Sequence, residues 1–584
     1  MRLGDASVRV SLNRGFRWRH LARDGLGVWV KGYAFHAGRF HDSDGLARLL
    51  VDKLENRPIR DAVGVVRELN GSFAVAVRAR DSVFAAVDRL RSIPLFYGGR
   101  REEGGVRSEL KVSDDAFWVR QQTGDTSIDP VSEGEFVRAG YVFGRHTLSP
   151  SVRQLEPGQY LLMEMPNAKC QTSDCRDPGV DVEFYYRHVH GPYLDMDEAG
   201  YFNQLDAVSS NVFRRLVESV QGRTILLPLS SGYDSRYIAA MLKTQGYERV
   251  VCYTYGRTGS FEVATSREVA RKLGFPWHYV EYNRDMWRDF FHSEAAAEYN
   301  VFAGNLASLP CLQDSIAVAT LRRNAVVPED AVVVPGYAGA TGFPVPAAGH
   351  GARGSRRLTR ELIEFTFDEN FLLANQVPPA VAAGIREHRA RTFLDLPTPQ
   401  SIDEVVSVNE AWFTAHRLSR FIVNAVRVYE FNGYEWRMPL WDNELTEYWY
   451  RVPEELRADR RLYEAYLRRR VFAPHGIDWR RHTKRRGPLL GLGRRVLAAL
   501  LPARAMQGVK KSYRRLGAGS GDINAFSEIS RLYREDLGPG GARGGTIETD
   551  VCVAHSVWYI QRLKDAQARG ELAPRRLGPM ATRR

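Results

Sequence analysis

The segment that most constrains the fold is a short apolar run followed by a turn of small residues and a helical pattern. Residues 225–227 read Ile-Leu-Leu, and residues 229–235 read Leu-Ser-Ser-Gly-Tyr-Asp-Ser. A second apolar run at 250–253 leads to a second helical segment at 262–273, which ends before Gly274. Strand, helix, strand and helix in this order predict a doubly wound parallel α/β sheet.

The amino-terminal part of the chain shows a different pattern. Alternating apolar and polar residues at 26–30 and 72–77 indicate strands. Asn70-Gly71 and Pro157-Gly158 are typical turn sequences. We therefore expect an α+β or all-β unit over residues 1–190.

The length and composition support a second unit. The chain has 584 residues, of which 44% are hydrophobic and 26% charged, as expected for a globular protein of about two to four domains. Helical periodicity dominates after Asp195, and the charged, proline-bearing stretch 188–197 is typical of a linker. We therefore place the second unit at 195–584.

Targeting signals and a disulfide framework are not apparent. No window reaches the ~18–20 apolar residues that a membrane span needs, and the amino-terminal residues lack an apolar signal core. The five cysteines are scattered and odd in number. We therefore expect a cytoplasmic protein with reduced thiols.

The net charge of +13 is concentrated in one place. Segment 479–515 holds twelve Lys or Arg residues and no acid, so the rest of the chain is nearly neutral. Its apolar insert at 489–501 leaves two interpretations open: an element that lies on an anionic membrane surface, at the inner face of the membrane, or a solvated loop between core helices. Aromatic residues are sparse there, so we expect no nucleic-acid partner.

The turn after the first strand carries groups that bind phosphate. Backbone amides at a helix start point at an incoming anion, and Gly232 lets that anion approach closely. Ser230, Ser231 and Ser235 add hydroxyl donors. Asp234 beside an anion indicates a bridging Mg²⁺. The alternative is an ordinary helix cap made of Ser and Asp.

This turn resembles the Ser-Gly-Gly-X-Asp-Ser pyrophosphate loop of the asparagine synthetase family. In that family an ATP-pyrophosphatase domain activates a carboxylate as its adenylate and then forms an amide. Further segments resemble the same family: 69–74, 88–97, 255–256, 332–342 and 437–442. The resemblance implies an Ntn-hydrolase-like glutaminase fold for residues 1–190 and ATP and Mg²⁺ as cofactors.

The resemblance also implies a set of nucleotide-binding residues. Gly336 and Gly339 belong to a second pyrophosphate loop, in which Ala340 replaces the acid that normally shares Mg²⁺ with Asp234. This replacement is expected to weaken Mg²⁺ binding. The implied binding residues are Ser230, Ser231, Gly232, Asp234, Ser235, Tyr255, Gly256, Gly336 and Gly339.

Two basic residues are candidates for stabilising the leaving pyrophosphate. Lys484 lies in a stretch, Trp479 to Lys484, that resembles the family's Trp-Arg…Lys segment, although His482 takes the lysine's aligned place. Arg236 follows the loop directly. The alternatives are one more charge in a basic run for Lys484 and an exposed helix residue for Arg236.

The family's glutaminase site is altered at several positions. Arg2 stands where the nucleophilic cysteine is expected, and the family's Asn-Gly-Glu appears as Lys31-Gly32-Tyr33. Asp88 remains in place, either as an amine contact or as a turn-capping residue. We therefore expect that glutaminase activity is lost and that ammonia or an amine of the substrate is the nucleophile.

The predicted protein is an AMP-forming carbon–nitrogen ligase. Divergent relatives suggest a sugar-acid or peptide carboxylate as acceptor, and the stretch 300–346 most resembles relatives suspected to act on uronic acids of surface polysaccharides. The alternative is a catalytically degenerate scaffold in such a pathway, for which Ala340 is the main evidence. The acceptor, the amine donor and the oligomeric state are not predicted.

Overall fold

The computed structural model describes residues 7–10, 14–79, 82–101, 108–164, 180–337, 377–394, 396–478, 522–538 and 547–579. The predictions for Arg2, Gly339, Ala340, Lys484 and segment 479–515 lie outside these residues.

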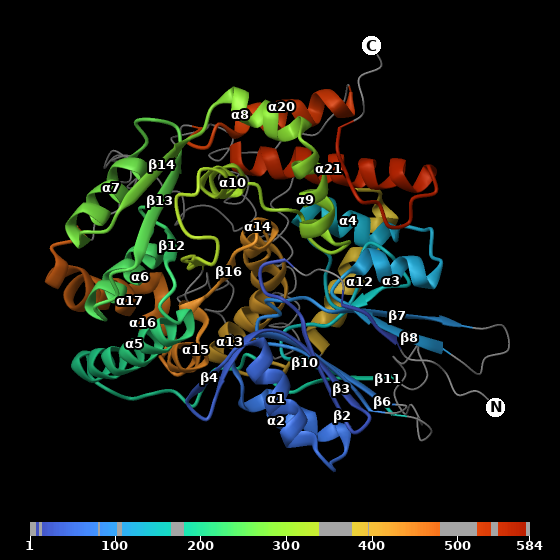
Figure 1. The fold of residues 1–584 in the computed structure, drawn as a ribbon, viewed down its shortest axis with the longest axis horizontal. Helices are drawn as coiled ribbons and strands as arrows, with labels where there is room; N and C mark the ends of the chain where they lie inside the picture. The colour runs from blue at the N-terminus through green and yellow to red at the C-terminus, as the bar shows by residue number, and fades with distance from the viewer. Residues whose placement is uncertain are drawn as a thin grey trace.

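The amino-terminal region contains two sheets, drawn in blue and cyan in Figure 1. The larger one has seven strands and is antiparallel. Its strands are β2 (Arg19–Arg23), β3 (Leu26–His36), β4 (Arg39–His41), β5 (Asn70–Ala79), β6 (Ser82–Val87), β10 (Gln159–Met163) and β11 (Val180–Phe184). The smaller sheet comprises β1 (Ser7–Val8), β7 (Phe96–Arg101), β8 (Ser108–Ser113) and β9 (Arg153–Gln154).

Helices cover both sheets of this region. Apolar residues of α1 (Ser43–Leu54) and α2 (Ala62–Glu68) share a core with one face of the larger sheet. α3 (Ala116–Thr123) packs on β7 and β8, and α4 (Pro130–Ala139) packs against later helices. The α+β alternative of the sequence prediction is therefore the one observed.

One of the two predicted turns is wrong. Asn70 and Gly71 begin β5 and pair with β3 instead of turning the chain. A Cβ atom on Gly71 would lie 2.3 Å from the carbonyl oxygen of Tyr33, so this glycine permits a close approach of two strands. Pro157-Gly158 does form a turn, and Gly158 has a φ of +69°.

The predicted parallel sheet is present. Five strands, all parallel, lie in the order β14-β13-β12-β15-β16. They are β12 (Ile225–Pro228), β13 (Val250–Gly256), β14 (Trp277–Glu281), β15 (Val332–Val333) and β16 (Glu435–Trp436). Since β13 and β14 extend to one side of β12 and β15 and β16 to the other, the strand order reverses between β12 and β15. Ligands of doubly wound sheets bind at such a reversal, outside the carboxyl ends of the strands.

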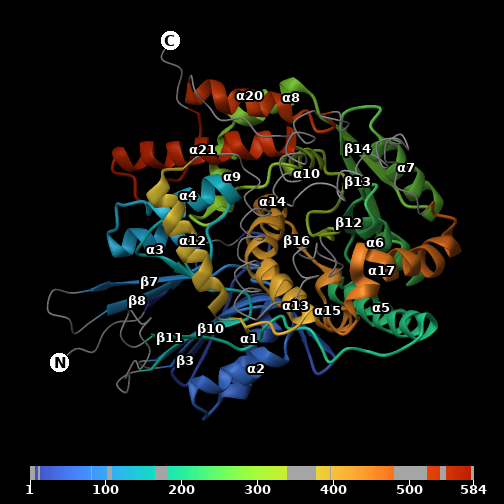
Figure 2. The ribbon, with the colours of Figure 1, turned by 180° about the vertical axis from the view of Figure 1, so that it is seen from behind.

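Helices cover both faces of the parallel sheet (Figures 1 and 2). Ile225 and Leu227 share a core with α5 (Glu198–Val220), α6 (Tyr233–Thr244) and α7 (Phe261–Leu273). Leu226, which points to the opposite face, shares a core with α10 (Ser315–Arg323) and α14 (Arg427–Phe431).

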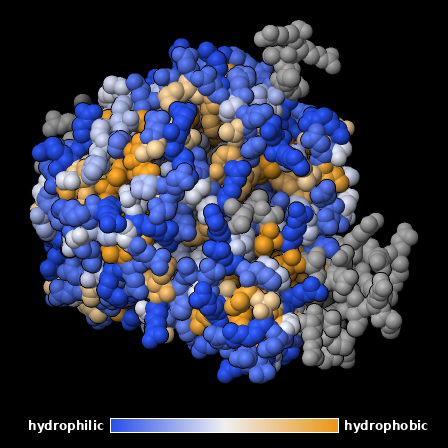
Figure 3. Space-filling model, in the orientation of Figure 1, coloured by the Kyte–Doolittle hydropathy of each residue, from blue (hydrophilic) through white to orange (hydrophobic). Residues whose placement is uncertain are grey.

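Further helices complete the molecule: α8 (Arg284–His292), α9 (Glu294–Gly304), α12 (Pro379–Leu394), α13 (Ile402–Phe413), α15 (Asn443–Tyr450), α16 (Glu454–Arg457), α17 (Arg461–Tyr466), α20 (Phe526–Leu537) and α21 (Ile547–Ala568). Within the described ranges, none of the helices combines the length and the apolar character that crossing a membrane requires. The face in Figure 3 is mostly hydrophilic, with small hydrophobic groups between the polar side chains.

The stretch predicted as a linker, 188–197, is irregular up to α5 but packed. One ring nitrogen of the buried His188 lies 2.7 Å from the carbonyl oxygen of Arg89, and the other lies 2.8 Å from the hydroxyl of Tyr450. This stretch therefore contacts elements on both of its sides. The domain boundary near residue 190 stays a prediction.

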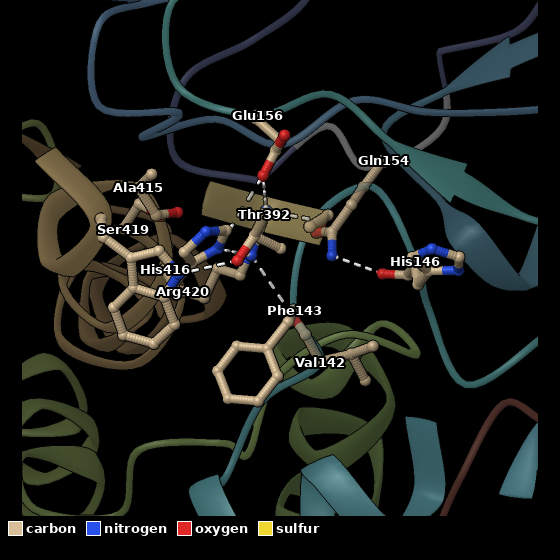
Figure 4. A network of polar contacts seen from close by, with 12 residues as sticks. Val142, Phe143, His146, Gln154, Glu156, Thr392, Ala415, His416, Ser419 and Arg420 are labelled. Atoms are coloured by element: carbon tan, nitrogen blue, oxygen red, sulfur yellow. Dashed lines mark hydrogen bonds and ion pairs between the residues drawn. The ribbon is translucent and has the colours of Figure 1, made fainter. Parts of the chain in front are cut away.

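A buried polar network also joins the two parts of the chain (Figure 4). The guanidinium of Arg420, in the helical segment Thr414–Ile422, donates to the Glu156 carboxylate at 3.1 Å and to the carbonyl oxygen of Gly144 at 2.6 Å. The same guanidinium contacts His416 at 2.6 Å. The amino-terminal region is therefore held to the later helices by charged contacts that water does not reach.

Candidate functional site

A cavity of about 250 Å³ lies where the strand order of the parallel sheet reverses. The ends of β12 and β13 form one side of it, and the loop after β15 forms another. Among the described residues, its lining consists of Pro228, Leu229, Ser230, Ser235, Tyr253, Thr254, Tyr255, Glu262, Gln313, Asp314, Pro335, Gly336, Tyr337, Tyr429, Ile523 and Asn524. The volume approaches that of ordinary ligand pockets, ~300–1,000 Å³.

The predicted phosphate loop forms one wall of this cavity. The amide of Ser230 donates to the hydroxyl oxygen of Ser235 at 3.1 Å, and the amide of Gly232 donates to that of Ser230 at 3.0 Å. α6 begins at Tyr233 with no side-chain cap among the described residues. The alternative interpretation of this turn, an ordinary helix cap made of Ser and Asp, is therefore not observed.

The second loop packs directly on this helix start. A Cβ atom on Gly336 would lie 2.7 Å from the amide nitrogen of Ser235. Only glycine allows the two backbones to come this close. The structure thus brings Gly336 together with Ser230 and Ser235, as the sequence predicts, whereas Gly339 lies outside the described residues.

Ser231 is bound to an acidic side chain of α7. Its amide donates to one carboxylate oxygen of Glu262 at 2.6 Å, and its hydroxyl donates to the other at 2.7 Å. Glu262 also lines the cavity. The sequence marked Glu262 only as the start of a helix, so this contact between the loop and a carboxylate was missed.

Asp234 lies in the first turn of α6 but outside the described lining. One of its carboxylate oxygens accepts a hydrogen bond from the Tyr463 hydroxyl at 2.6 Å. Burial raises the pKa of Tyr463 well above its usual value, and the Asp234 carboxylate adds to that shift. The tyrosine is therefore the donor.

Mg²⁺ fits this arrangement in one way only. No group of three or more His, Cys, Asp or Glu side chains that could hold a metal ion occurs in the ranges that the structure describes. Mg²⁺ commonly binds through one or two carboxylates and the phosphates of a substrate. The Asp234 carboxylate, in the first turn of α6, would be the acidic ligand of such an ion when a nucleotide supplies the remaining ligands.

Arg236 is placed differently from both interpretations of the sequence. Its side chain is 0% exposed, which contradicts the alternative of an exposed helix residue. The guanidinium donates to the backbone carbonyl oxygens of Gly232 at 3.1 Å and Asp478 at 2.6 Å. It does not belong to the cavity lining, so the geometry gives its predicted catalytic role no support.

Tyr255 and Gly256 end β13 at the cavity. Tyr255 lines the cavity and donates its hydroxyl proton to Asp314. Gly256 lies outside the lining and has a φ of +124°. A Cβ atom on it would lie 2.8 Å from the carbonyl oxygen of Ile523, so the glycine permits a close contact with the segment before α20.

Asp314 is the main site residue that the sequence did not reveal. It is 5% exposed and accepts hydrogen bonds from three tyrosine hydroxyls, those of Tyr253 at 3.2 Å, Tyr429 at 2.7 Å and Tyr255. Burial raises the pKa of the Asp314 carboxyl. The one available signal was a single acid within the mostly apolar stretch 309–318, where Gln313 and Ser315 flank it.

The altered glutaminase-like positions contain no comparable cavity. The cavities lined by Lys31, by Tyr33 and by Asp88 measure about 20, 40 and 20 Å³. Each holds about one or two waters. Within the described residues, these positions therefore leave no room for an amino acid.

Side chains fill this space instead. The ammonium group of Lys31, 1% exposed, lies 3.9 Å from the Asp114 carboxylate and 3.7 Å from that of Glu430. The guanidinium of Arg437 lies 4.1 Å from the centre of the Tyr33 ring. The contacts with Glu430 and Arg437 join the amino-terminal region to residues on either side of β16.

Asp88 serves as a structural acceptor. Its carboxylate accepts from the amides of Phe73 at 3.1 Å, Leu90 at 2.8 Å and Ser92 at 3.1 Å, and from the Ser92 hydroxyl at 2.5 Å. Four donors occupy the ~four lone-pair sites of a carboxylate. The turn-capping interpretation of Asp88 is therefore the one that the structure supports.

Comparisons with known proteins identify one curated relative. No family model matches the chain. A probable asparagine synthetase (glutamine-hydrolyzing) of Acanthamoeba polyphaga mimivirus is 24% identical over 236 residues, which cover 38% of this chain and 36% of that relative. The chain thus spans about a third of the length of the curated relative that it matches.

Two solved structures show weaker likeness. A glutamine phosphoribosylpyrophosphate amidotransferase of B. subtilis, complexed with ADP and GMP, is 12% identical, covers 56% of this chain and 64% of its own, and gives a TM-score of 0.19. An allosteric regulatory enzyme of purine biosynthesis is 13% identical, covers 59% of both chains and gives a TM-score of 0.18. Scores this low support no conclusion about the fold.

Proposed function

We propose that this chain, which is similar over 236 residues to a probable asparagine synthetase, is an ATP-dependent ligase that forms an amide. A carboxylate reacts with MgATP to give an acyl-adenylate and pyrophosphate, and an amine then attacks to give the amide and AMP. The observation that carries the proposal is the cavity at the reversal of the parallel sheet, which Ser230, Ser235 and Gly336 line at the start of α6.

In the proposed reaction, the first-turn amides of α6 and the hydroxyls of Ser230 and Ser235 bind the β- and γ-phosphates. Asp234 would hold Mg²⁺ together with phosphate oxygens, and the ion would supply positive charge for the leaving pyrophosphate. Among the described residues, the cavity lining has no lysine, arginine or histidine. Lys484 therefore remains the proposed cation for the pyrophosphate.

The proposed nitrogen donor is ammonia or an amine of the substrate. Lys31 and Tyr33 replace the polar glutamine contacts, and Asp88 is saturated by four donors. These observations support a lost glutaminase. We further propose a sugar-acid or peptide carboxylate as acceptor, and a location at an anionic membrane surface through segment 479–515.

The test is release of pyrophosphate from ATP with candidate carboxylates and ammonium chloride. We expect turnover by the full chain and a loss of at least ~100-fold in Asp234→Ala, because one charge of the metal site is removed. Asp285→Ala is the matched control, since Asp285 occupies the first turn of α8 and is exposed. Turnover that appears only in Ala340→Asp would contradict the proposal and indicate a scaffold.

A further inference from the structure

We propose that Asp314 and the tyrosines around it form a subsite for a primary ammonium group, the nucleophile of the amide-forming step. This role rests on the proposed ligase function, but binding of the cation does not depend on it. The inference follows from the charge of the cavity, the direction of its hydrogen bonds and its aromatic walls.

The cavity has negative charge without a positive partner. Its described lining includes the carboxylates of Glu262 and Asp314 and no basic side chain. Glu262 is already bound by the amide and hydroxyl of Ser231. Asp314 receives only neutral hydroxyl donors from the described residues. Burying a carboxylate without a cation is costly, and such exceptions to ordinary packing concentrate at functional sites.

The hydrogen bonds of the cage select a group that only donates. Tyr253, Tyr255 and Tyr429 direct their protons to the Asp314 carboxylate, so their oxygens retain only lone pairs for a ligand. The hydroxyl of Tyr337 lies 2.9 Å from that of Tyr429 and extends the cage. An ammonium group has three donors and no acceptor, which matches this set.

Tyrosine side chains form much of the cavity wall. Tyr253, Tyr255, Tyr337 and Tyr429 all line the cavity, and the ring of Tyr255 stacks on that of Tyr282 at 5.1 Å, which holds the Tyr255 hydroxyl beside Asp314. A carboxylate or phosphate would instead meet the Asp314 charge, so the phosphate loop and the tyrosine cage attract opposite partners within one cavity.

In the reaction, the bound ammonium group gives one proton to the Asp314 carboxylate. The nitrogen lone pair then attacks the acyl carbon of the adenylate and forms the carbon–nitrogen bond. The bond between that carbon and the phosphate oxygen breaks, its electron pair leaves with AMP, and the second proton passes from nitrogen to water. Asp314 returns its proton to water before the next turnover.

The experiment measures binding of ¹³C-methylammonium chloride to the full chain by NMR line broadening, without nucleotide. We expect saturable binding by the wild type and at least tenfold weaker binding by Asp314→Asn. Tetramethylammonium chloride at equal ionic strength has no N–H donor and is expected not to compete. Asp330→Asn, at an exposed aspartate outside the cavity, is the matched control and is expected to bind as the wild type does.

Thermal unfolding of each variant shows whether it is folded. If Asp314→Asn does not fold, Tyr255→Phe and Tyr429→Phe keep the rings and remove one hydroxyl each, and each is expected to weaken binding severalfold. Unchanged binding in a folded Asp314→Asn chain, or equal binding of tetramethylammonium, would overturn the subsite.

Turnover separates this inference from the proposed function. Binding that depends on Asp314 in a chain that releases no pyrophosphate supports the subsite and overturns the ligase. Pyrophosphate release with an amine KM that is unchanged in Asp314→Asn supports the ligase and overturns the subsite. Ammonium chloride and glucosamine, supplied as alternative nucleophiles, distinguish free ammonia from a substrate amine by the mass of the amide product.

Discussion

Asp88 in the amino-terminal region and Asp314 beside the parallel sheet are both buried aspartates, 2% and 5% exposed. Burial raises the pKa of both carboxyl groups. Asp88 accepts from three backbone amides and one serine hydroxyl, and it lines a cavity of about 20 Å³. Asp314 accepts from tyrosine hydroxyls and lines a cavity of about 250 Å³.

Residue type, burial and pKa direction are therefore alike, and they do not separate the two roles. The donors do. Backbone amides are fixed by the fold and leave Asp88 saturated, so that it stabilises a turn. Tyrosine hydroxyls keep lone pairs free and enclose a space, so Asp314 retains capacity for a ligand. In the described residues, the surroundings of Asp88 are therefore closed, while the cavity at the parallel sheet is open.

The largest expected effect concerns closure of the amino-terminal region. Lys31→Met removes the cation between Asp114 and Glu430 and leaves Asp114 buried without it, while Glu430 keeps its ion pair with Arg427 at 2.7 Å. The free energy of unfolding is expected to fall by about 3–5 kcal/mol. Urea unfolding measures this, with the exposed Lys53→Met as control. A loss below ~1 kcal/mol would show that Lys31 does not hold the region closed.

The junction of the two regions is expected to be sensitive to acid. Burial lowers the pKa of His188 from 6.5 to about 4. As the pH falls below 6.5, the unfolded chain takes up a proton that the folded chain does not, so the free energy of unfolding falls with pH. This contribution amounts to about 2–3 kcal/mol between pH 7 and 4.5.

His188→Gln removes the titrating group. Between pH 7 and 4.5, this variant is expected to lose about 2–3 kcal/mol less stability than the wild type does. Urea unfolding at the two pH values measures it, and the exposed His278→Gln is the control that should match the wild type. An unchanged pH slope would mean that folding does not lower the pKa of His188.

A smaller effect tests the structural role of Asp88. In Asp88→Asn, an NH₂ group in place of Oδ2 removes the acceptor of the Phe73 amide and of the Ser92 hydroxyl, whereas the Ser92 amide keeps Oδ1 at 3.3 Å. The free energy of unfolding is expected to fall by about 1–3 kcal/mol, while pyrophosphate release by the folded fraction stays unchanged. A loss of turnover without a loss of stability would instead give Asp88 a part in the chemistry.

Asp314→Asn is expected to show a pH trend in stability that Asp88→Asn shares, because burial raises the pKa of both carboxyl groups. A raised pKa means that the ionised Asp314 carboxylate opposes folding above that pKa, and this opposition disappears as the pH falls through it. The asparagine variant is therefore expected to gain more stability relative to the wild type at pH 8 than at pH 4. The contrast between them lies in turnover with ammonium chloride, and equal effects of the two substitutions on that turnover would remove it.

Much of the parallel sheet could be predicted because its signals are local. Apolar runs, the small-residue turn and the helix end at Gly274 are each contained in a few neighbouring residues, and Gly274 has the positive φ, +73°, that such an end requires. The family resemblance added Gly336, which does contact the first turn of α6. These residues meet because successive parallel strands end at one edge.

The tyrosine cage could not be predicted because no local pattern marks it. Tyr255, Tyr337 and Tyr429 come from three distant segments and meet only in the folded chain. The burial of Arg236 likewise depends on Asp478, which lies 242 residues away. The turn predicted at Asn70-Gly71 was wrong for a related reason. These residues pair with β3, and this pairing outweighs their local preference for a turn.

The smallest expected effect lies in the cavity itself, where Glu262 occupies the amide of Ser231. A phosphate at the loop competes with this carboxylate for the same donor. Glu262→Gln removes the charge and weakens a charge-assisted hydrogen bond. The KM for MgATP is therefore expected to fall about 3- to 10-fold, or ~1 kcal/mol, at unchanged kcat.

Glu281→Gln is the matched control, because Glu281 ends the neighbouring strand β14, accepts a hydroxyl proton from Thr258 at 2.7 Å and does not line the cavity. Its KM for MgATP is expected to equal that of the wild type. A higher KM in Glu262→Gln would mean that the carboxylate holds the loop in its binding form, as backbone amides hold Asp88. A lower KM means that the contact is exchangeable, and exchangeable contacts are what distinguish the open cavity from the closed region.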